Sequence, residues 1–600
     1  MNILLTAINA KYIHSNLAVY SLRACAGEYR DAVELAEYTI NNQKDYILEE
    51  LYKRKPDVLC FSCYIWNIDY VTDIAREYKK LCPSVPIWVG GPEVSYEVEA
   101  FLRENPYIDG VMIGEGEDTF RELCAYYHAN PDMDNVNAFK KLADISGIAF
   151  RDDNGSVIFT PTRPIKNMSE IPFCYDTLDD FSNRIIYYES SRGCPFSCSY
   201  CLSSVDKTLR FRDTEIVKRE LKFFIDQKVP QIKFVDRTFN CNHAHAMELW
   251  RFIKANDNGV TNFHFEISAD LLNQEELELI SDMRPGLIQL EIGVQSTNEV
   301  TIKEIHRTMK LERLKEVVRL IQSGNNIHEH LDLIAGLPYE DYDSFGRSFD
   351  EIYELKPNQL QLGFLKVLKG SYMFEHATEY GIVYHDKPPY EVMSTKWLSF
   401  DDVIKIKRVE DMLEVYYNSG QFEITMKLME CIFDSAFEFF QELGDFYEAN
   451  GYFGMSHSRI RRCEILLEFL ALYLHGCDSN AITSVVLSEN AGDRDNTDFD
   501  ENAQIYSMIQ ESLIFDLYYR ENCKSRPVWA TDIGSFKHMT HAYCKNGKLS
   551  HVEPFHYIFP DKHTRKLDEL PKYHKEPVWA LFHYDMRDPL DHQALVEYIE

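Results

Sequence analysis

Residues 191–201 read S-R-G-C-P-F-S-C-S-Y-C and contain three cysteines, Cys194, Cys198 and Cys201, in a C-x3-C-x2-C spacing. The Gly-Cys-Pro opening allows a tight backbone turn, and the short gaps let three thiolates converge on one iron centre. Three thiolates leave one iron of a cubane cluster without a protein ligand, which is typical of a site that binds and activates a second molecule. The alternatives are a zinc knuckle that lacks its fourth ligand and a chance grouping of cysteines.

The run before these cysteines, residues 185–189, predicts a β-strand, so the cysteines lie on the loop after its C-terminal end. Active sites of parallel barrels lie on such loops. Six strand-and-connector units in a row predict a partial (β/α)6 barrel over residues 185–370. The five later strand-like runs, each followed by a helix-like run, span residues 231–236, 262–267, 287–292, 330–338 and 359–364.

This strand-loop motif, with the aromatic Tyr200 just before the third cysteine, resembles the radical S-adenosylmethionine (SAM) superfamily. The strings E-I-G-V-Q-S at residues 291–296 and D-L-I-A-G-L-P at residues 332–338 resemble that superfamily's later strands. The resemblance implies that the three cysteines hold a 4Fe-4S cluster whose free iron chelates the amino and carboxylate groups of SAM.

The candidate SAM-binding residues lie on the matching strings. Carboxylate and amide groups suit ribose hydroxyls and an amino group, so the candidates are Glu291, Gln295 and Ser296, while Tyr200 of the cysteine motif is a further cofactor-binding candidate. The end of the second barrel strand, F-V-D-R-T-F-N at residues 234–240, replaces the Gly-Gly-Glu often found in the superfamily. Contact between Asp236 and the amino group is therefore doubtful, and a contact with Arg237 or a helix cap accounts equally well for the charge.

The first 130 residues alternate short apolar runs with amphipathic helical stretches. Such a pattern predicts a doubly wound, flavodoxin-like Rossmann sheet, which binds its ligand at the C-terminal edge of the strands. Ser62 ends the third strand-like run, and Gly90 and Gly91 end the fourth, where missing side chains let a flat ligand approach the backbone. The expected strands span residues 3–8, 33–38, 58–62, 87–91 and 108–113.

These edge residues resemble the Ser-x-Leu and Gly-Gly signatures of cobalamin-binding domains, with Tyr64 in place of the leucine. The G-E-G-E turn at residues 114–117 resembles the cobalamin-binding subgroup of radical SAM enzymes. Generic sheet-to-helix turns are the alternative explanation of each motif. The resemblance implies that cobalamin contacts Ser62, Tyr64, Gly90, Gly91, Glu115 and Gly116.

The sequence lacks the Asp-x-His-x-x-Gly string whose histidine ligates cobalt in cobalamin domains of the mutase kind. His14 lies in the loop after the first strand and is a candidate axial ligand, because an imidazole held by its second nitrogen can bind cobalt. A helix cap or a contact with the ligand's periphery is the commoner role of a loop histidine. The favoured state is cobalamin with no protein axial donor.

Two regions carry less information about chemistry. Residues 131–184 are expected to form a linker with a hairpin around residues 153–155, since Asn-Gly favours a primed turn. Residues 371–600 predict a mostly α-helical domain, with helices at 430–447 and 464–474 and a loop-rich tail at 526–588. This region resembles the uncharacterised C-terminal extension of some cobalamin-dependent radical SAM proteins, and we expect it to cover the mouth of the barrel.

The amino-acid composition limits the possible partners of the protein and its cellular compartment. The formal net charge of −33 disfavours nucleic acid as a substrate, because phosphate contacts need a basic surface. The sequence has no apolar run long enough to cross a bilayer, and its first residues are expected to form a strand rather than a signal peptide. The 15 cysteines lack disulfide-like spacing, which predicts a reducing, cytoplasmic location, and the open cluster favours anaerobic conditions.

The resemblance therefore implies a cobalamin-dependent radical SAM enzyme. In such enzymes a 5′-deoxyadenosyl radical from SAM abstracts hydrogen from an unactivated carbon, and methylcobalamin donates a methyl group. The predicted function is a methyltransferase that acts on a small molecule, with an electron donor such as flavodoxin or ferredoxin. The alternatives are a radical cyclase or rearrangement enzyme and a noncatalytic cobalamin or redox sensor. Methylthio transfer to RNA is disfavoured because the cysteine-containing N-terminal domain of those enzymes is absent.

Overall fold

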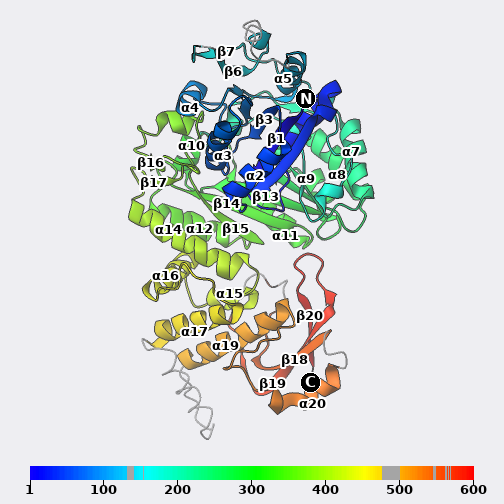
Figure 1. The fold of residues 1–600 in the computed structure, drawn as a ribbon. Helices are drawn as coiled ribbons and strands as arrows, with labels where there is room; N and C mark the ends of the chain where they lie inside the picture. The colour runs from blue at the N-terminus through cyan, green and yellow to red at the C-terminus, as the bar shows by residue number, and fades with distance from the viewer. Residues whose placement is uncertain are drawn as a thin grey trace.

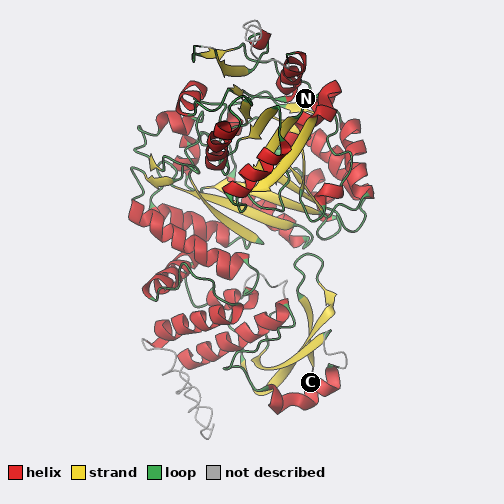
Figure 2. Cartoon of the chain, in the orientation of Figure 1, coloured by secondary structure: helices red, strands yellow, loops and turns green. Residues whose placement is uncertain are grey.

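The computed structural model describes residues 1–130, 141–152, 154–475, 501–544, 549–560 and 569–599, together with residues 564 and 567. Figure 1 shows an N-terminal α/β sheet above a second sheet, with a mostly helical region below. Helices flank both α/β sheets, and a small separate sheet lies near the C-terminus (Figure 2). None of the helices in these described ranges combines the length and apolar character needed to span a bilayer.

Seven strands form the N-terminal sheet in the order β2-β1-β3-β4-β5-β6-β7, and the pairs among the first five strands are parallel. Strands β1 and β3 are buried along their whole length because helices cover both faces of the sheet. Leu51 and Val71 pack on one face, whereas Val19 and Phe120 pack on the other. The predicted doubly wound sheet is confirmed. Its elements are β1 (Ile3–Asn9), α1 (Leu17–Cys25), β2 (Val33–Thr39), α2 (Lys44–Arg54), β3 (Val58–Ser62), α3 (Ile68–Leu81), β4 (Ile87–Gly90), α4 (Val98–Glu104), β5 (Gly110–Met112) and α5 (Glu117–Ala129).

The predicted hairpin forms and extends this sheet. Strands β6 (Ile148–Arg151) and β7 (Val157–Phe159) are antiparallel, and β6 pairs with β5. Asp153 and residues 131–140 lie outside the described residues. The two strands β6 and β7 of the expected linker thus continue the N-terminal sheet.

Six parallel strands form the second sheet in the order β15-β14-β13-β12-β11-β8. Across the described residues the sheet is not closed, as expected for a partial (β/α)6 barrel. Its elements are β8 (Ile186–Tyr188), α7 (Thr214–Asp226), β11 (Gln231–Phe234), α8 (His243–Ala255), β12 (Asn262–Ile267), α9 (Gln274–Ser281), β13 (Ile288–Gln295), α10 (Glu299–Glu304), α11 (Leu311–Ser323), β14 (His328–Ala335), α12 (Tyr342–Tyr353) and β15 (Gln359–Phe364).

Strand β13 shows how the sequence sets the two faces of this sheet. Its alternate residues Ile288, Leu290, Ile292 and Val294 are buried against the surrounding helices. Because side chains alternate along a strand, Glu291 and its alternating neighbours face the interior of the barrel. The two-residue period of the sequence therefore places polar side chains in the lumen.

The C-terminal region is mostly helical, as predicted, but the expected loop-rich tail is wrong. Residues 550–599 contain an antiparallel sheet in the order β18-β19-β20. Prolines and histidines suggested loops, yet Pro554 lies on edge strand β18, where proline is tolerated. The elements are α13 (Tyr372–His376), β16 (Val383–Tyr384), β17 (Val392–Ser394), α14 (Phe400–Leu413), α15 (Glu423–Met429), α16 (Ala436–Ala449), α17 (Arg459–His475), α19 (Glu501–Arg520), α20 (Lys537–Tyr543), β18 (Ser550–Tyr557), β19 (Tyr573–Arg587) and β20 (Ala594–Ile599).

Helices α16, α17 and α19 do not cover the mouth of the barrel, contrary to expectation, whereas the Met373 N–H of α13 donates a hydrogen bond of 3.0 Å to the Ser199 carbonyl in the cysteine loop. Helices α16, α17 and α19 lie on the far side of α12 and α14 from the N-terminal sheet (Figure 1). The reason is apolar packing, since Phe437 of α16 packs against Phe345 and Phe349 of α12. The segment directly after β15 does reach the N-terminal sheet, where Tyr390 donates a hydrogen bond to Glu93.

Candidate functional site

Two short antiparallel strands, β9 (Ser191–Arg192) and β10 (Arg210–Phe211), frame the cysteine loop. Gly193 has a φ of +85°, and a Cβ at this position would lie 2.6 Å from the carbonyl oxygen of Thr208. The tight turn before Cys194 therefore requires glycine. The Cys201 N–H donates to the Cys198 carbonyl at 3.2 Å, which folds the second half of the motif into a compact turn.

The structure brings the three thiols together. Cys194 and Cys198 are buried, and Cys201 is partly exposed. Burial raises the pKa of the Cys194 thiol, hydrogen bonds from Phe196 and Thr238 oppose the shift, and the charges of Cys201 and Cys198 add to it. The charges of Cys198 and Cys201 thus act on the Cys194 thiol, which places the three thiols near one another.

This donor set fits a cluster better than a single ion. Within the described ranges, no three His, Cys, Asp or Glu side chains are placed to hold one metal ion. A single zinc ion needs its ligands within about 2.3 Å, whereas a cubane offers each thiolate its own iron. Three thiols on one compact loop therefore match the donor set of a 4Fe-4S cluster.

A cavity of about 140 Å³ lies beside the cysteine loop. Its walls come from the loop itself and from the C-terminal ends of the barrel strands, where a ligand of a parallel barrel is expected. The lining is rich in charged and amide side chains, so the cavity suits a polar ligand. The residues that line it are Phe196, Cys198, Arg237, Thr238, Glu266, Ile267, Ser268, Glu291, Gly293, Gln295, Arg307, Thr308 and Asp332.

Glu291, a predicted SAM-binding residue, lines the cavity and has two partners inside the barrel. Its carboxylate accepts hydrogen bonds from Lys233 at 3.0 Å and from His264 at 2.9 Å. Burial alone would raise the pKa of Glu291, but the hydrogen bond from His264 and the charge of Lys233 outweigh it and lower the pKa to about 2. Glu291 is thus a fixed anion at neutral pH.

We expect Glu291→Gln to destabilise the fold by about 3 kcal/mol at pH 7, since one pKa unit corresponds to about 1.4 kcal/mol. A lowered carboxyl pKa stabilises the folded state above the unfolded pKa near 4.3, and this contribution is lost as the pH falls towards 2. Urea denaturation at several pH values should therefore show a shallower acid loss in the variant. The exposed Glu278→Gln is the control, and equal acid slopes in wild type and Glu291→Gln would contradict the assignment.

Gln295 and Tyr200 lie at the same cavity or directly beside it. Gln295 lines the cavity with a left-handed φ of +77°, and its buried Oε1 has no hydrogen-bond partner among the described residues. An acceptor in this state fits a ligand that donates a hydrogen bond. The Tyr200 hydroxyl accepts a bond of 3.3 Å from Arg307, whose Nη1 also lies 3.9 Å from the sulfur of Cys198.

Ser296 is not brought to this cavity. Its side chain is buried and donates to the Glu340 carboxylate at 2.6 Å. Burial raises the pKa of Glu340 to about 7, although the hydrogen bonds from Ser296 and Ser348 oppose the shift. Ser296 therefore faces away from the other candidates for SAM contact.

Asp236 supports the chain just before the cysteine loop. It forms neither the expected contact with Arg237 nor a helix cap. Its carboxylate accepts hydrogen bonds from the Ser190 N–H at 2.9 Å and from the hydroxyls of Ser190 and Ser191 at 2.6 Å and 2.5 Å. Burial raises the pKa of Asp236 to about 6 against these bonds. The residue anchors the chain just before the cysteines and does not face the cavity.

Sequence reasoning missed Glu266, Arg237, Arg307 and Asp332 in the cavity wall. Burial raises the pKa of Glu266 to about 7, while Arg237 lowers it. The sequence does contain a signal for Glu266. His264 and Glu266 alternate with the buried Phe263 and Phe265, which predicts that the two polar side chains face the interior of the barrel. Arg307 follows α10 with no periodic pattern, so nothing in the sequence marked it.

Small residues end three adjacent strands of the N-terminal sheet. Ser62 ends β3, Gly90 ends β4 with Gly91 after it, and Gly114 follows β5 with open space where a Cβ would stand. The Ser62 hydroxyl accepts a hydrogen bond of 3.2 Å from Asn16. An edge without bulky side chains at the C-terminal ends of parallel strands fits a flat ligand such as cobalamin.

Gly91 offers a direct test of this edge. Its φ is +125°, and a Cβ would lie 2.3 Å from the carbonyl oxygen of Cys63. We expect Gly91→Ala to lose more than about 2 kcal/mol of stability and to retain less cobalamin. The cost of a positive φ at alanine and the cost of the clash with the Cys63 backbone add to each other. Gly155→Ala is the matched control, since Gly155 has a φ of +79° but open space at the Cβ position. Equal losses measured by urea denaturation in the two variants would contradict the close strand approach.

Tyr64 and His14 face the barrel. Tyr64 stacks on Trp66 with ring centroids 4.4 Å apart, and its pKa, which burial raises to about 12, also responds to Glu189 and Arg237 of the barrel. His14 Nδ1 lies 2.7 Å from the hydroxyl of Tyr187 on β8. Burial and the charge of Lys11 lower the pKa of His14, so its imidazole is neutral at pH 7. Axial ligation by His14 stays a prediction.

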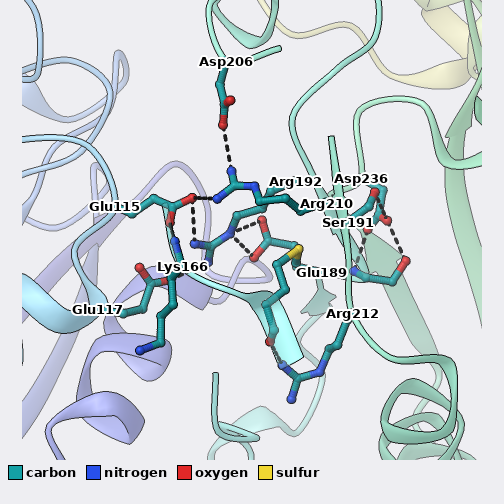
Figure 3. Close-up of polar contacts among 12 residues, drawn as sticks. Glu115, Glu117, Lys166, Glu189, Ser191, Arg192, Asp206, Arg210, Arg212 and Asp236 are labelled. Carbon is teal, nitrogen blue, oxygen red and sulfur yellow. Dashed lines mark hydrogen bonds and ion pairs between the residues drawn. The ribbon is translucent and has the colours of Figure 1, made fainter. Parts of the chain in front are cut away.

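Glu115 pairs with the barrel part of the chain. It forms an ion pair of 2.6 Å with Arg210 and one of 3.5 Å with Arg192 (Figure 3). Gly116 is the N-cap residue of α5, and a Cβ there would lie 3.0 Å from the side chain of Leu22. The predicted cobalamin contacts of Glu115 and Gly116 stay predictions, while the carboxylate of Glu115 points towards the strands that frame the cysteines.

Family models match three parts of the chain. Residues 3–124 match the B12 binding domain, residues 188–352 match the radical SAM superfamily, and residues 378–593 match a protein of unknown function, DUF4080. The chain therefore combines a B12 binding domain, a radical SAM domain and a DUF4080 region.

Individual proteins resemble parts of the chain. It is 27% identical over 318 residues to 2-(S-pantetheinyl)-carbapenam-3-carboxylate methyltransferase from Streptantibioticus cattleyicolor, over 50% of this chain and 45% of that protein. It is 23% identical to the anaerobic magnesium-protoporphyrin IX monomethyl ester cyclase of Rubrivivax gelatinosus, over 56% of this chain and 60% of that protein. The chain spans about half the length of the curated relatives it matches.

A solved structure supports the fold. The cobalamin-dependent SAM radical enzyme OxsB, in its apo form, matches with a TM-score of 0.55 and 15% identity, over 86% of this chain and 80% of that chain. The agreement extends beyond the two α/β parts, because it covers more of the chain than residues 3–352 alone. At this identity the match defines the architecture only.

Proposed function

We propose that the chain is a cobalamin-dependent radical SAM methyltransferase that acts on an unactivated carbon of a small-molecule substrate. The observation that carries the proposal is the opposition of two sites. Glu115, on the turn after the last parallel strand of the B12-binding sheet, forms an ion pair of 2.6 Å with Arg210 beside the cysteine loop, and His14 Nδ1 lies 2.7 Å from the hydroxyl of Tyr187 on barrel strand β8. A methyltransferase among the relatives agrees with this activity.

The cofactors supply the reactive chemistry, since the cluster and SAM would generate a 5′-deoxyadenosyl radical and cobalamin would supply a methyl group. The chain's own residues bind and orient them. We assign the cluster to Cys194, Cys198 and Cys201, and the polar parts of SAM to the cavity lined by Glu291 and Gln295. The buried anion Glu291 and the orphaned acceptor Gln295 Oε1 both suit groups that donate hydrogen bonds.

We assign the contacts with cobalamin to Ser62, Gly90 and Gly91 at the edge of the B12-binding sheet. We also propose that a reduced flavodoxin or ferredoxin supplies electrons and that the chain works in an anaerobic cytoplasm. The net charge of −33 argues against a nucleic-acid substrate.

A radical cyclase is the second candidate, and the similarity to the Rubrivivax cyclase favours it. Cyclisation needs the same two sites but no methyl group from SAM. A noncatalytic cobalamin or redox sensor is the third, and it needs no SAM cleavage.

The products formed from SAM separate the three candidates. The reduced, anaerobically purified holoprotein should be incubated with methyl-labelled SAM and a small-molecule extract of the cells that express it. A methyltransferase yields 5′-deoxyadenosine and S-adenosylhomocysteine, and the label moves to a small molecule. Formation of 5′-deoxyadenosine with no S-adenosylhomocysteine would favour the cyclase, and neither product would favour the sensor.

A further inference from the structure

The two strands that frame the cysteine loop place like charges directly opposite each other. Arg192 of β9 pairs across the strands with Arg210 of β10. Like charges opposite one another destabilise a strand pair. Arg192 and Arg210 are mostly buried, with 17% and 12% of their side chains exposed, so water screens this repulsion poorly.

Carboxylates from both sides of the domain junction compensate these charges. The barrel part supplies Glu189, which accepts from the Nε of Arg192 at 2.9 Å, and Asp206, which lies 2.7 Å from Arg210. The B12-binding domain supplies Glu115, shared by both arginines, and Glu117, whose carboxylate lies 2.5 Å from Arg192 (Figure 3).

The two carboxylates from the B12-binding domain are held firmly. Glu117 begins α5 and has only 6% of its side chain exposed. Glu115 also accepts a hydrogen bond from the backbone N–H of Lys166. Because Arg192 lies two residues before Cys194, a shift of this turn is transmitted to the first cysteine over a very short path.

We propose that Arg192 is a positioning residue, through which Glu115 and Glu117 of the B12-binding domain fix the cysteine loop at a set distance from the cobalamin edge. The inference deepens the proposed function and rests on it for the identity of the two cofactors. Buried ion pairs contribute modestly to net stability, but removal of one partner leaves an uncompensated charge. The pairs therefore act mainly on the orientation of the loop.

The first measurement follows the loop without any cofactor. Amide hydrogen exchange of residues 193–209 should be at least about tenfold faster in Glu117→Gln and Arg192→Gln than in wild type, because an uncompensated buried charge favours local opening. Arg192→Lys keeps the charge but not the forked geometry, so we expect an intermediate rate. The matched control is Glu122→Gln, since Glu122 lies on the same helix and pairs with Arg163 away from the loop.

The second measurement follows the distance between the two cofactors. In reduced holoprotein, the electron paramagnetic resonance (EPR) signal of cob(II)alamin should show dipolar broadening from the cluster, and the broadening should change in Glu117→Gln and Arg192→Gln but not in Glu122→Gln. Unchanged exchange and unchanged broadening in both variants would overturn the inference. If either variant fails to fold, Glu115→Gln removes a more exposed partner and takes its place in both measurements. A wild-type chain that binds no cobalamin would overturn the proposed function, while the exchange rates would still decide the role of Arg192.

Discussion

Cys198→Ala should abolish SAM cleavage by the reduced holoprotein. The sulfur of Cys198 is buried at the cavity wall and lies beside Arg307, so no other described thiol replaces it in this place. We expect the rate of 5′-deoxyadenosine formation to fall by at least about 10³-fold. The reason is that SAM cleavage depends on the cluster, and enzymes accelerate their reactions by about 10⁶-fold or more. Chromatography of the nucleoside products under anaerobic conditions measures the loss.

The control for this variant is Cys431→Ala, since Cys431 is exposed and belongs to the C-terminal region. It should retain full iron content and full SAM cleavage. Cleavage that survives in Cys198→Ala with normal iron content would contradict the assignment of the cluster.

Arg307→Met should shift the midpoint potential of the cluster to more negative values. The guanidinium lies 3.9 Å from the sulfur of Cys198, and cluster potentials depend on nearby charge and on hydrogen bonds to sulfur. Loss of a charged hydrogen bond worth about 1.5 kcal/mol corresponds to roughly 60 mV for one electron. Redox titration followed by EPR measures the shift.

Two variants serve as controls for this prediction. Arg307→Lys keeps the positive charge and should shift the potential less than Arg307→Met. Arg313→Met removes a surface arginine that pairs with Glu316 and should leave the potential unchanged. A potential in Arg307→Met equal to that of wild type would show that the guanidinium does not act on the cluster.

Much of the fold was predictable because its signals are local. The apolar runs of β1 and β3 are buried along their whole length, and the two-residue alternation of β13 separates its core face from its lumen face. The cysteine spacing marked the loop, since three ligands within eight residues need no tertiary information. The small C-terminal sheet was missed because Pro554 and the neighbouring histidines obscured the strand pattern.

The site was harder to predict than the fold. Glu291 and Gln295 reach the cavity because they alternate along one strand, whereas Ser296, the next residue, turns away to Glu340. The link between Arg192 and Glu117 joins residues 75 positions apart. A contact of this kind depends on how two domains pack, and no local spacing in the sequence encodes it.

The metal and cofactor content of the chain purified without oxygen tests the central claim most directly. Joint optical, EPR and iron analysis should find one cobalamin and about four irons per chain, with the iron lost in Cys198→Ala and the cobalamin retained. A wild-type chain that retains no cobalamin, or that keeps its iron without Cys198, would contradict the account.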